Sequence, residues 1–206
     1  MDKVRILIAD DHTIVRTGLT ALLGTVPGLE VVGEAKNGEE AVQQAAKLKP
    51  DLVIMDLIMP KKDGAAATAE IISALPDTRI LVLTSVGTSD AIAKALDAGA
   101  TGAMMKDSPN SSLISAIRAV AAGRSAISPE VRRMIARDPP IDVLTPRQVE
   151  VLQSLTRGLT NRDIANQLSI SEDRVEQHIR SLLEKLGAAN RTEAVAIALR
   201  KHLLKI

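Results

Sequence analysis

The chain of 206 residues is long enough for one large domain or two small ones, each able to bury a hydrophobic core. Its 46% hydrophobic and 25% charged residues, with a formal net charge of +1, are typical of a globular protein and exclude a highly charged, unfolded chain. The absence of cysteine excludes disulfides, thiol nucleophiles and cysteine-ligated metal sites, and the absence of Phe, Tyr and Trp disfavours binding of single-stranded nucleic acid by aromatic stacking.

Short β-rich runs alternate with helical patterns through residues 1–122. The runs cover residues 4–9, 30–34, 51–55, 79–84 and 102–105, and the helical patterns cover 13–24, 38–48, 64–75, 89–98 and 110–122. Continuous apolar strands separated by helices indicate a parallel sheet that is covered on both faces. We therefore predict an α/β domain over residues 1–122, built on a doubly wound, five-stranded parallel sheet.

The pattern breaks up over residues 123–143, which contain Gly and Pro and no strand signal. We predict a linker here, with a short helix over 131–136. Four further helical patterns follow, at residues 146–157, 161–168, 172–186 and 191–203. They predict a compact all-α domain over 144–206, in which Thr145-Pro146 and Ser171-Glu172 begin helices. From Ile141 onward, ten Lys and Arg against eight Asp and Glu give a charge of +2, which alone does not indicate nucleic-acid binding.

Polar side chains follow the predicted strands of the first domain, where ligands bind in doubly wound sheets. They are Asp10 and Asp11, then Asp56, then Thr84 and Ser85, and finally Lys106. Carboxylates held close together repel one another unless a cation joins them, and hard oxygen ligands suit Mg²⁺, so we predict a magnesium site. Asp56 ends the central strand and is the expected nucleophile toward phosphorus. Each residue taken singly has a simpler interpretation: Asp11 caps a helix, Thr84 ends a strand, and Lys106 is a solvated charge.

Blocks of sequence around these residues resemble the receiver domain of bacterial two-component response regulators over residues 3–122. The blocks are Ile8-Ala9-Asp10-Asp11-His12, Met55-Asp56-Leu57-Ile58-Met59-Pro60 with Asp63-Gly64, Leu83-Thr84-Ser85, and Ala98-Gly99-Ala100-Thr101-Gly102 continuing to Met105-Lys106-Asp107. The resemblance implies a flavodoxin-like fold in which a partner histidine kinase phosphorylates Asp56. It also implies that Asp10, Asp11, Asp56 and Ile58 form the Mg²⁺ site and that Thr84 and Lys106 contact the phosphoryl group. His12 shows no metal-ligand spacing.

The sequence departs from the receiver pattern at Ala103, where the family usually has an aromatic residue or histidine whose rotation reports phosphorylation. We therefore expect switching to depend on Thr84 and on repacking of the helix over 89–98. Ile58 and Val86 are apolar and lie two residues beyond key site residues, where they hinder water. A long-lived phosphoryl group on the protein is the expected result.

In the C-terminal domain, the helix over 161–168, a short turn and the helix over 172–186 form a helix-turn-helix pattern, whose second helix is the candidate for the DNA major groove. Apolar residues at helical spacing on this helix should face the core: Val175, Ile179, Leu182, Leu183 and Leu186. This leaves Arg174, Gln177, Arg180 and Ser181 on the other side. Arg and Gln can bind guanine and adenine edges, although an ordinary amphipathic surface helix has the same pattern.

The same region, residues 142–204, resembles the LuxR-type DNA-binding domain of the NarL/FixJ class of response regulators. The matching blocks are Leu144-Thr145-Pro146-Arg147, Glu150-Val151-Leu152, Gly158 to Ala165, Leu168-Ser169-Ile170-Ser171, Val175, His178-Ile179 and Leu183-Glu184-Lys185-Leu186-Gly187. The resemblance implies base contacts from Glu176, Gln177 and Arg180, and phosphate contacts from Arg162, Arg174 and Lys185. Glu176 replaces the usual basic residue, so we expect an operator that differs from the family's common one.

Together these features predict a cytoplasmic, homodimeric transcription regulator that is switched by phosphorylation, binds double-stranded DNA and turns over no separate substrate. No apolar run approaches the roughly 18 residues of a membrane span, and the N-terminus lacks a signal-peptide pattern. Two alternatives are a hydrolase or phosphatase that uses the acidic cleft, and a DNA binder that ignores phosphorylation. The last helix, with Ala194, Val195, Ala198 and Leu199, either pairs with a second copy or packs in the core.

Overall fold

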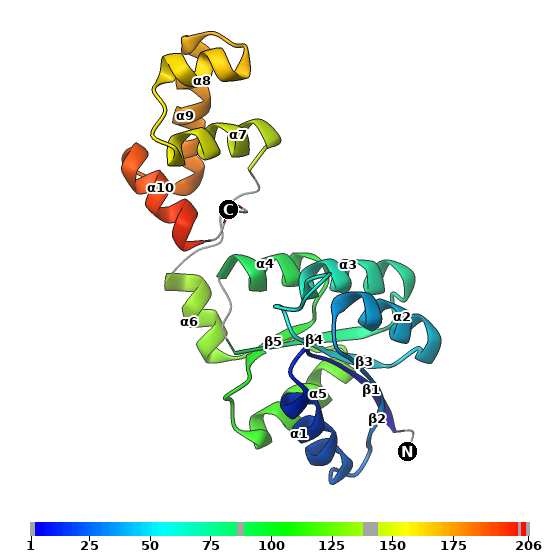
Figure 1. Cartoon of the computed structure of the whole chain (residues 1–206). Helices are drawn as coiled ribbons and strands as arrows, with labels where there is room; N and C mark the ends of the chain where they lie inside the picture. Colours follow the sequence, from blue (N-terminus) through cyan, green and yellow to red (C-terminus); the bar gives the residue numbers. More distant parts are fainter. Residues whose placement is uncertain (1–2, 86–88, 138–143, 202, 205–206) are drawn as a thin grey trace. The chain divides into compact units, whose positions relative to one another are not determined.

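The computed structural model describes residues 3–85, 89–137, 144–201 and 203–204 of the chain. The chain forms two compact units, Met1–Pro140 and Ile141–Ile206. Each unit has its own hydrophobic core, and Figure 1 shows the elements of both. Within the described ranges, no helix has the length and apolar character needed to cross a membrane.

The first unit is built on a parallel sheet with the strand order β2-β1-β3-β4-β5-β6. Its strands are β1 Val4–Ala9, β2 Leu29–Ala35, β3 Leu52–Met55, β4 Arg79–Thr84, β5 Gly102–Met105 and β6 Ala126–Ile127. All neighbouring strands are paired in parallel. The structure therefore confirms the predicted doubly wound α/β architecture, but the sheet has six strands and not five.

The extra strand, β6, is only two residues long and lies at the edge of the sheet beside β5. The backbone N–H of Ser128 donates to the carbonyl of Ala103 at 2.9 Å, and that of Ala126 donates to Thr101 at 3.3 Å. A two-residue strand is too short to produce an alternating or continuous apolar pattern, so the sequence carries no signal for it. Helix α6, Pro129–Arg137, follows directly and packs on β5 and α4. The short helix predicted over 131–136 is therefore confirmed as α6, but the structure adds β6 and packs α6 on the first unit, so this part of the predicted linker 123–143 belongs to that unit.

Helices cover both faces of this sheet (Figure 1). They are α1 Thr13–Gly24, α2 Gly38–Leu48, α3 Gly64–Ala74, α4 Ser89–Asp97 and α5 Asn110–Ala121. Apolar residues of α2, α3, α4 and α6 pack in one core cluster, and those of α1 and α5 pack in another on the opposite face. Because the strands are buried on both sides, the carboxyl ends of β1, β3, β4 and β5 are held at one edge of a rigid layer.

The second unit consists of four helices around one core. They are α7 Pro146–Thr156, α8 Asn161–Leu168, α9 Glu172–Leu186 and α10 Arg191–Arg200. The predicted helix starts are confirmed: Thr145 accepts from the backbone of Gln148 in a capping box, and Ser171 accepts from the backbone of Arg174. Such caps satisfy N–H groups that the first helical turn leaves free. In α10, Ala194 and Ala198 are buried in the core, whereas Leu199 is exposed.

Candidate functional site

Two buried carboxylates lie at the carboxyl edge of the sheet. Asp10 directly follows β1 and Asp56 directly follows β3, and the backbone N–H of Asp56 donates to the carbonyl of Ala9 at 2.8 Å. The two residues are only 2% and 4% exposed, whereas Asp11 is exposed. The parallel pairing of β1 with β3 thus brings together residues that are 46 positions apart in the chain.

Lys106 contacts both of these carboxylates. It follows β5, and its backbone N–H donates to the carbonyl of Thr84 at 2.8 Å. Its Nζ lies 2.6 Å from Oδ2 of Asp10 and 2.8 Å from Oδ2 of Asp56. The structure therefore gathers Asp10, Asp56 and Lys106 into one ion-paired group, with Thr84 buried at the adjacent strand end.

The environment shifts the pKa values of this group. Burial raises the pKa of Asp56, the nearby negative charge of Asp10 adds to this effect, and the ammonium of Lys106 opposes it. Burial lowers the pKa of Lys106, but its hydrogen bonds to Asp10 and Asp56 outweigh the burial, so its pKa is raised overall. Lys106 consequently stays protonated, while the ionised form of Asp56 is destabilised and gains from additional positive charge.

The donor atoms at this edge fit a small divalent cation. Oxygen or nitrogen atoms of Asp10, Asp11, His12 and Asp56 all lie within 4.8 Å of one another. Three carboxylates against one ammonium leave an excess of negative charge, and carboxylate oxygens are the ligands that Mg²⁺ prefers. The cluster therefore fits the magnesium site that the sequence predicts. Ile58, which is 61% exposed, has no ligand atom in its side chain and offers only its backbone carbonyl.

Three residues that support the site had no role assigned to them from the sequence. His12, which shows no metal-ligand spacing in the sequence, lies with its Nδ1 2.8 Å from Oδ1 of Asp11 and 3.3 Å from Oδ1 of Asp10, so the fold brings it into the carboxylate cluster that the spacing did not indicate. Arg16 on α1 donates from Nη1 to the carbonyl of Asp10 at 2.7 Å. Gly64 packs so closely that a Cβ there would lie 2.0 Å from the carbonyl oxygen of Asp56. Gly64 belongs to the receiver-like sequence blocks, but Arg16 has no signal in the sequence.

Thr84 and Ala103, the two positions that bear on switching, are both buried but lie on different strands. Thr84 is 1% exposed at the end of β4. Ala103 on β5 is fully buried in the core cluster that also contains Val131 of α6. Val86, which we expected to hinder water, lies outside the described residues.

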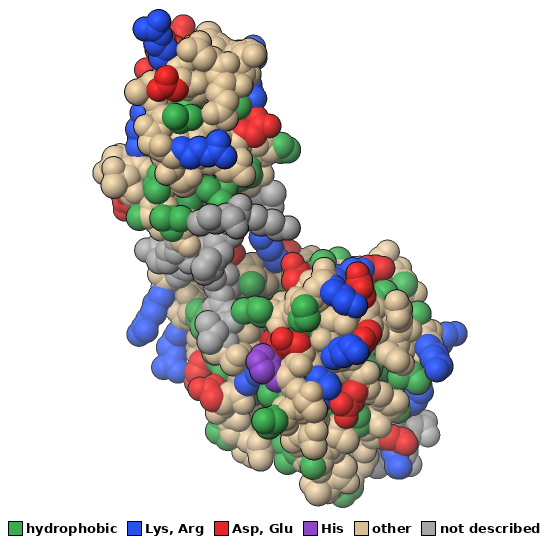
Figure 2. Space-filling model, in the orientation of Figure 1, with side chains coloured by type: hydrophobic (Ala, Val, Ile, Leu, Met, Phe, Trp, Pro, Cys, Tyr) green, Lys and Arg blue, Asp and Glu red, His purple; other side chains and the backbone are tan. Residues whose placement is uncertain are grey.

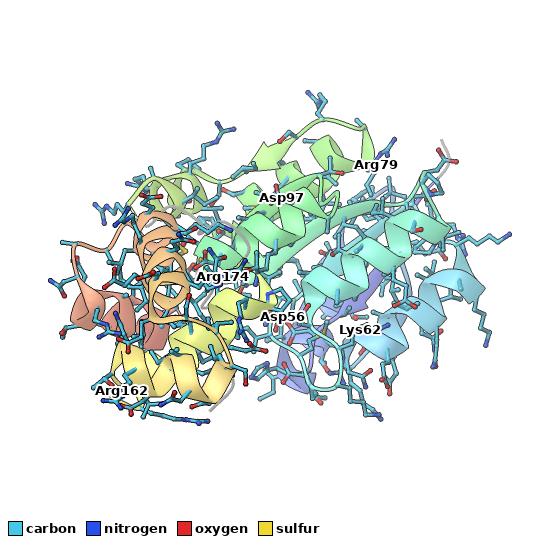
Figure 3. The ribbon with its side chains drawn as sticks, turned by 90° about the horizontal axis from the view of Figure 1, so that it is seen from above. Asp56, Lys62, Arg79, Asp97, Arg162 and Arg174 are labelled. Atoms are coloured by element: carbon cyan, nitrogen blue, oxygen red, sulfur yellow. The ribbon has the colours of Figure 1, made fainter. Side chains whose placement is uncertain are left out.

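In the second unit, α9 presents a polar face away from its core. Val175, Ile179, Leu182 and Leu186 are buried as predicted, and Leu183 is partly buried. Most of the predicted DNA-contacting residues are exposed: Arg162 on α8, and Arg174, Glu176, Gln177 and Arg180 on α9, while Lys185 is half-buried. Figure 3 marks Arg162 and Arg174 on their helices.

The assignment of Ser181 to the exposed side of α9 is wrong. Its side chain is half-buried, and its Oγ accepts a hydrogen bond from Nε2 of Gln148 at 3.1 Å. Gln148 belongs to α7, so this bond ties α7 to α9. Helical periodicity placed Ser181 at the border of the polar face, and only the position of α7 shows that it faces another helix.

Comparisons with known proteins agree with both units. Residues 6–118 match the model of the response regulator receiver domain, and residues 142–198 match the model of the bacterial regulatory proteins of the luxR family. The chain belongs to the response-regulator family. Response regulator protein VraR of Staphylococcus aureus is 36% identical over 207 residues, which cover 98% of this chain and 99% of that protein. This response regulator thus joins a receiver domain to a LuxR-type DNA-binding domain, as transcription regulators of two-component systems do.

Solved structures show the same likeness. The crystal structure of response regulator ChrA, from a heme-sensing two-component system, is 35% identical with a TM-score of 0.59 and covers 99% of this chain and 100% of its own. A structure of the response regulator RcsB in complex with DNA is 27% identical with a TM-score of 0.70 and covers 97% of this chain and 99% of its own. The response regulator therefore matches full-length relatives in both of its units.

Proposed function

We propose that this response regulator is switched when a cognate sensor histidine kinase transfers a phosphoryl group to Asp56. The observation that carries the proposal is the ion-paired group of Asp10, Asp56 and Lys106, because two buried carboxylates share one ammonium beside a cluster suited to Mg²⁺. Phosphorylation then promotes dimerisation and operator binding by the second unit. The protein acts in the cytoplasm, where its DNA target lies, and turns over no separate substrate.

The transfer requires a nucleophile and positive charge around the phosphoryl oxygens. A carboxylate oxygen of Asp56 attacks phosphorus, and the bond from phosphorus to the donor's imidazole nitrogen breaks, leaving an acyl phosphate. Lys106 moves its contact from the carboxylates to a phosphoryl oxygen, and the hydroxyl of Thr84 donates to another. Asp10, Asp11, Asp56 and the carbonyl of Ile58 would hold Mg²⁺, which supplies further positive charge.

For DNA binding, we propose that α9 enters the major groove. Glu176, Gln177 and Arg180 contact base edges, and Arg162, Arg174 and Lys185 contact phosphates. The exposure of five of these six side chains supports this assignment. Structures of the related RcsB, described as dimers bound to DNA, support a homodimer that contacts two half-sites.

The first experiment is intact-mass measurement after incubation with acetyl phosphate and Mg²⁺, with the Asp56→Asn variant as the control. A gain of one phosphoryl group by the wild type alone supports the proposal. Phosphorylation of the variant to the same extent would contradict the role of Asp56. Omission of Mg²⁺ with EDTA present should abolish the gain in mass.

The structure also favours one second candidate, a DNA binder that does not depend on phosphorylation. Ala103 is fully buried, and its methyl group has no alternative rotamer with which to report the state of Asp56. Equal affinity of the wild type and Asp56→Asn for a DNA duplex, with and without acetyl phosphate, would favour this candidate. A difference that requires both Asp56 and acetyl phosphate would exclude it.

A further inference from the structure

The helix proposed to enter DNA carries little of the positive charge that DNA binding requires. Sequence-independent affinity for DNA comes from basic side chains that neutralise phosphates and release counterions. Helix α9 has three basic and four acidic side chains: Arg174, Arg180 and Lys185 against Glu172, Asp173, Glu176 and Glu184. Its net charge is therefore −1, so basic side chains outside α9 must contribute to phosphate neutralisation beside Arg174 and Lys185.

Helix α6 concentrates positive charge on one exposed face. Its sequence holds three arginines, Arg132, Arg133 and Arg137, and a single acidic residue, Glu130. Val131 is fully buried in the core cluster of the first unit, where Met134 and Ile135 also pack. Because these apolar residues fix one side of α6 against the sheet, the three arginines lie on the outer side and are all exposed.

The charge of α6 contrasts with the unit that carries it. Residues 1–140 have 16 Lys and Arg against 17 Asp and Glu, a net charge of −1, although α6 alone contributes +2. Figure 2 shows Lys and Arg side chains gathered along the edge of the first unit where α6 lies. The arginine face of α6, meaning Arg132, Arg133 and Arg137, is therefore a local basic patch on an otherwise slightly acidic unit.

The contacts of these arginines leave them able to bind an anion. Arg132 donates from Nε to the carbonyl of Ile127 at 3.3 Å, which uses one of the five donors of its guanidinium. Arg133 pairs with Glu130 at 3.0 Å, but both side chains are exposed, and such a pair is weak enough to exchange for a phosphate. Arg133 and Arg137 also line a surface depression of about 410 Å³ with Glu130 and Met134. Guanidinium groups bind phosphate oxygens through paired hydrogen bonds.

A short segment of chain joins α6 to the unit that carries α9. Only eight residues separate the end of α6 at Arg137 from the start of α7 at Pro146. Even when fully extended, they span at most about 30 Å. A DNA duplex presents a phosphate charge every 1.7 Å or so along its axis, so a duplex bound by α9 offers further phosphates on both sides of the bound site.

We propose that the arginine face of α6 is a second DNA-contacting surface, which binds backbone phosphates beside the site contacted by α9. The inference rests on the proposed DNA binding of the second unit. It adds phosphate contacts from α6 to those of Arg162, Arg174 and Lys185, and it leaves the selection of bases to α9.

The test measures the affinity of the full-length protein, treated with acetyl phosphate and Mg²⁺, for a 40-base-pair mixed-sequence duplex at several NaCl concentrations. The test variant is Arg132→Gln/Arg133→Gln/Arg137→Gln. One control replaces the same arginines with lysine, which keeps the charge. A second control is Lys3→Gln/Lys36→Gln/Lys47→Gln, which removes three exposed charges at the β2 side of the sheet, opposite β6. Thermal unfolding checks that all variants are folded.

Each phosphate contact contributes about 0.9 to the slope of log K against log salt concentration, so loss of three contacts should reduce the slope by about 2 to 3. The lysine variant and the β2-side variant should keep the wild-type slope. If the wild type binds the duplex and the glutamine variant keeps its slope and affinity, the α6 inference is refuted while the proposed function stands. If the wild type does not bind the duplex at the lowest NaCl concentration, the protein lacks sequence-independent affinity for DNA and the α6 inference is refuted, while the intact-mass experiment still tests the proposed function.

Discussion

The close approach of Gly64 to the phosphoacceptor strand gives a prediction that can be worked out from distances. A Cβ at position 64 would lie 2.0 Å from the carbonyl oxygen of Asp56 and 2.9 Å from Cα of Leu57. Ordinary contact begins at about 3.5 Å, so in Gly64→Ala the two backbones must separate by more than about 1 Å. This movement also breaks the hydrogen bond from the N–H of Gly64 to the carbonyl of Leu57, which measures 3.0 Å.

The expected cost combines forced repacking, about 1–3 kcal/mol, with the loss of a hydrogen bond, about 1 kcal/mol. A loss of about 2–4 kcal/mol lowers the melting temperature of the first unit by roughly 5–15 °C, which calorimetry can measure. Phosphorylation by acetyl phosphate should also slow, because Asp56 is displaced. The matched control is Gly18→Ala: Gly18 lies inside α1 with no atom within 4 Å of its added Cβ, so alanine should stabilise by about 0.5–1 kcal/mol. Equal melting temperatures for Gly64→Ala and the wild type would refute this reasoning.

Further predictions concern protonation, switching, lifetime and DNA contact. Because burial raises the pKa of Asp56 in the folded state, stability without metal should fall as the pH rises from about 4 through that pKa and then level off. Asp56→Asn in EDTA should therefore melt above the wild type at pH 7, and the difference should vanish in acid. Thr84→Ala should still be phosphorylated but should lose phosphorylation-dependent dimerisation in light scattering; unchanged dimerisation would contradict the role of Thr84. The exposed apolar side chain of Ile58 should keep water from the phosphoryl group, so its half-life, followed by intact mass, should exceed minutes; decay within seconds would argue against this. Arg180→Ala should weaken operator binding by about 1–3 kcal/mol, whereas an effect equal on all sequences would show that Arg180 contacts phosphate and not a base.

Much of the candidate site follows from the order of strands and the residues after them. Asp10, Asp56, Thr84 and Lys106 each stand at the carboxyl end of a predicted strand, and a parallel sheet places such ends at one edge. The position of these residues at strand ends was predictable because a continuous apolar run marks a buried strand without reference to distant residues. The same holds for α7 and α9, whose caps at Thr145 and Ser171 are local signals.

Other features depend on contacts between distant parts of the chain. Helical spacing left Ser181 at the border of the polar face of α9, and its partner Gln148 lies 33 residues away. The position of His12 beside Asp10 and Asp11 depends on how the chain turns from β1 into α1, which the spacing of metal ligands does not report. The sequence around Arg16 shows only that it lies in a helix. Its hydrogen bond to the carbonyl of Asp10 depends on the packing of α1 against the sheet.

The amino-acid sequence by itself determined the two-unit organisation of sheet and helices, the charged residues gathered at one edge of the sheet, and the apolar side of α9, because strand runs, helical periodicity and caps are local properties of the chain. Only the tertiary structure decided that residues 126–137 belong to the first unit. β6 is a strand because β5 offers it an unpaired edge, and α6 is fixed because Val131 is buried in the core cluster that also contains Ala103. The local sequence predicted a helix over 131–136, but hydrogen bonding at a sheet edge and the burial of Val131 depend on neighbours that only the folded chain brings together.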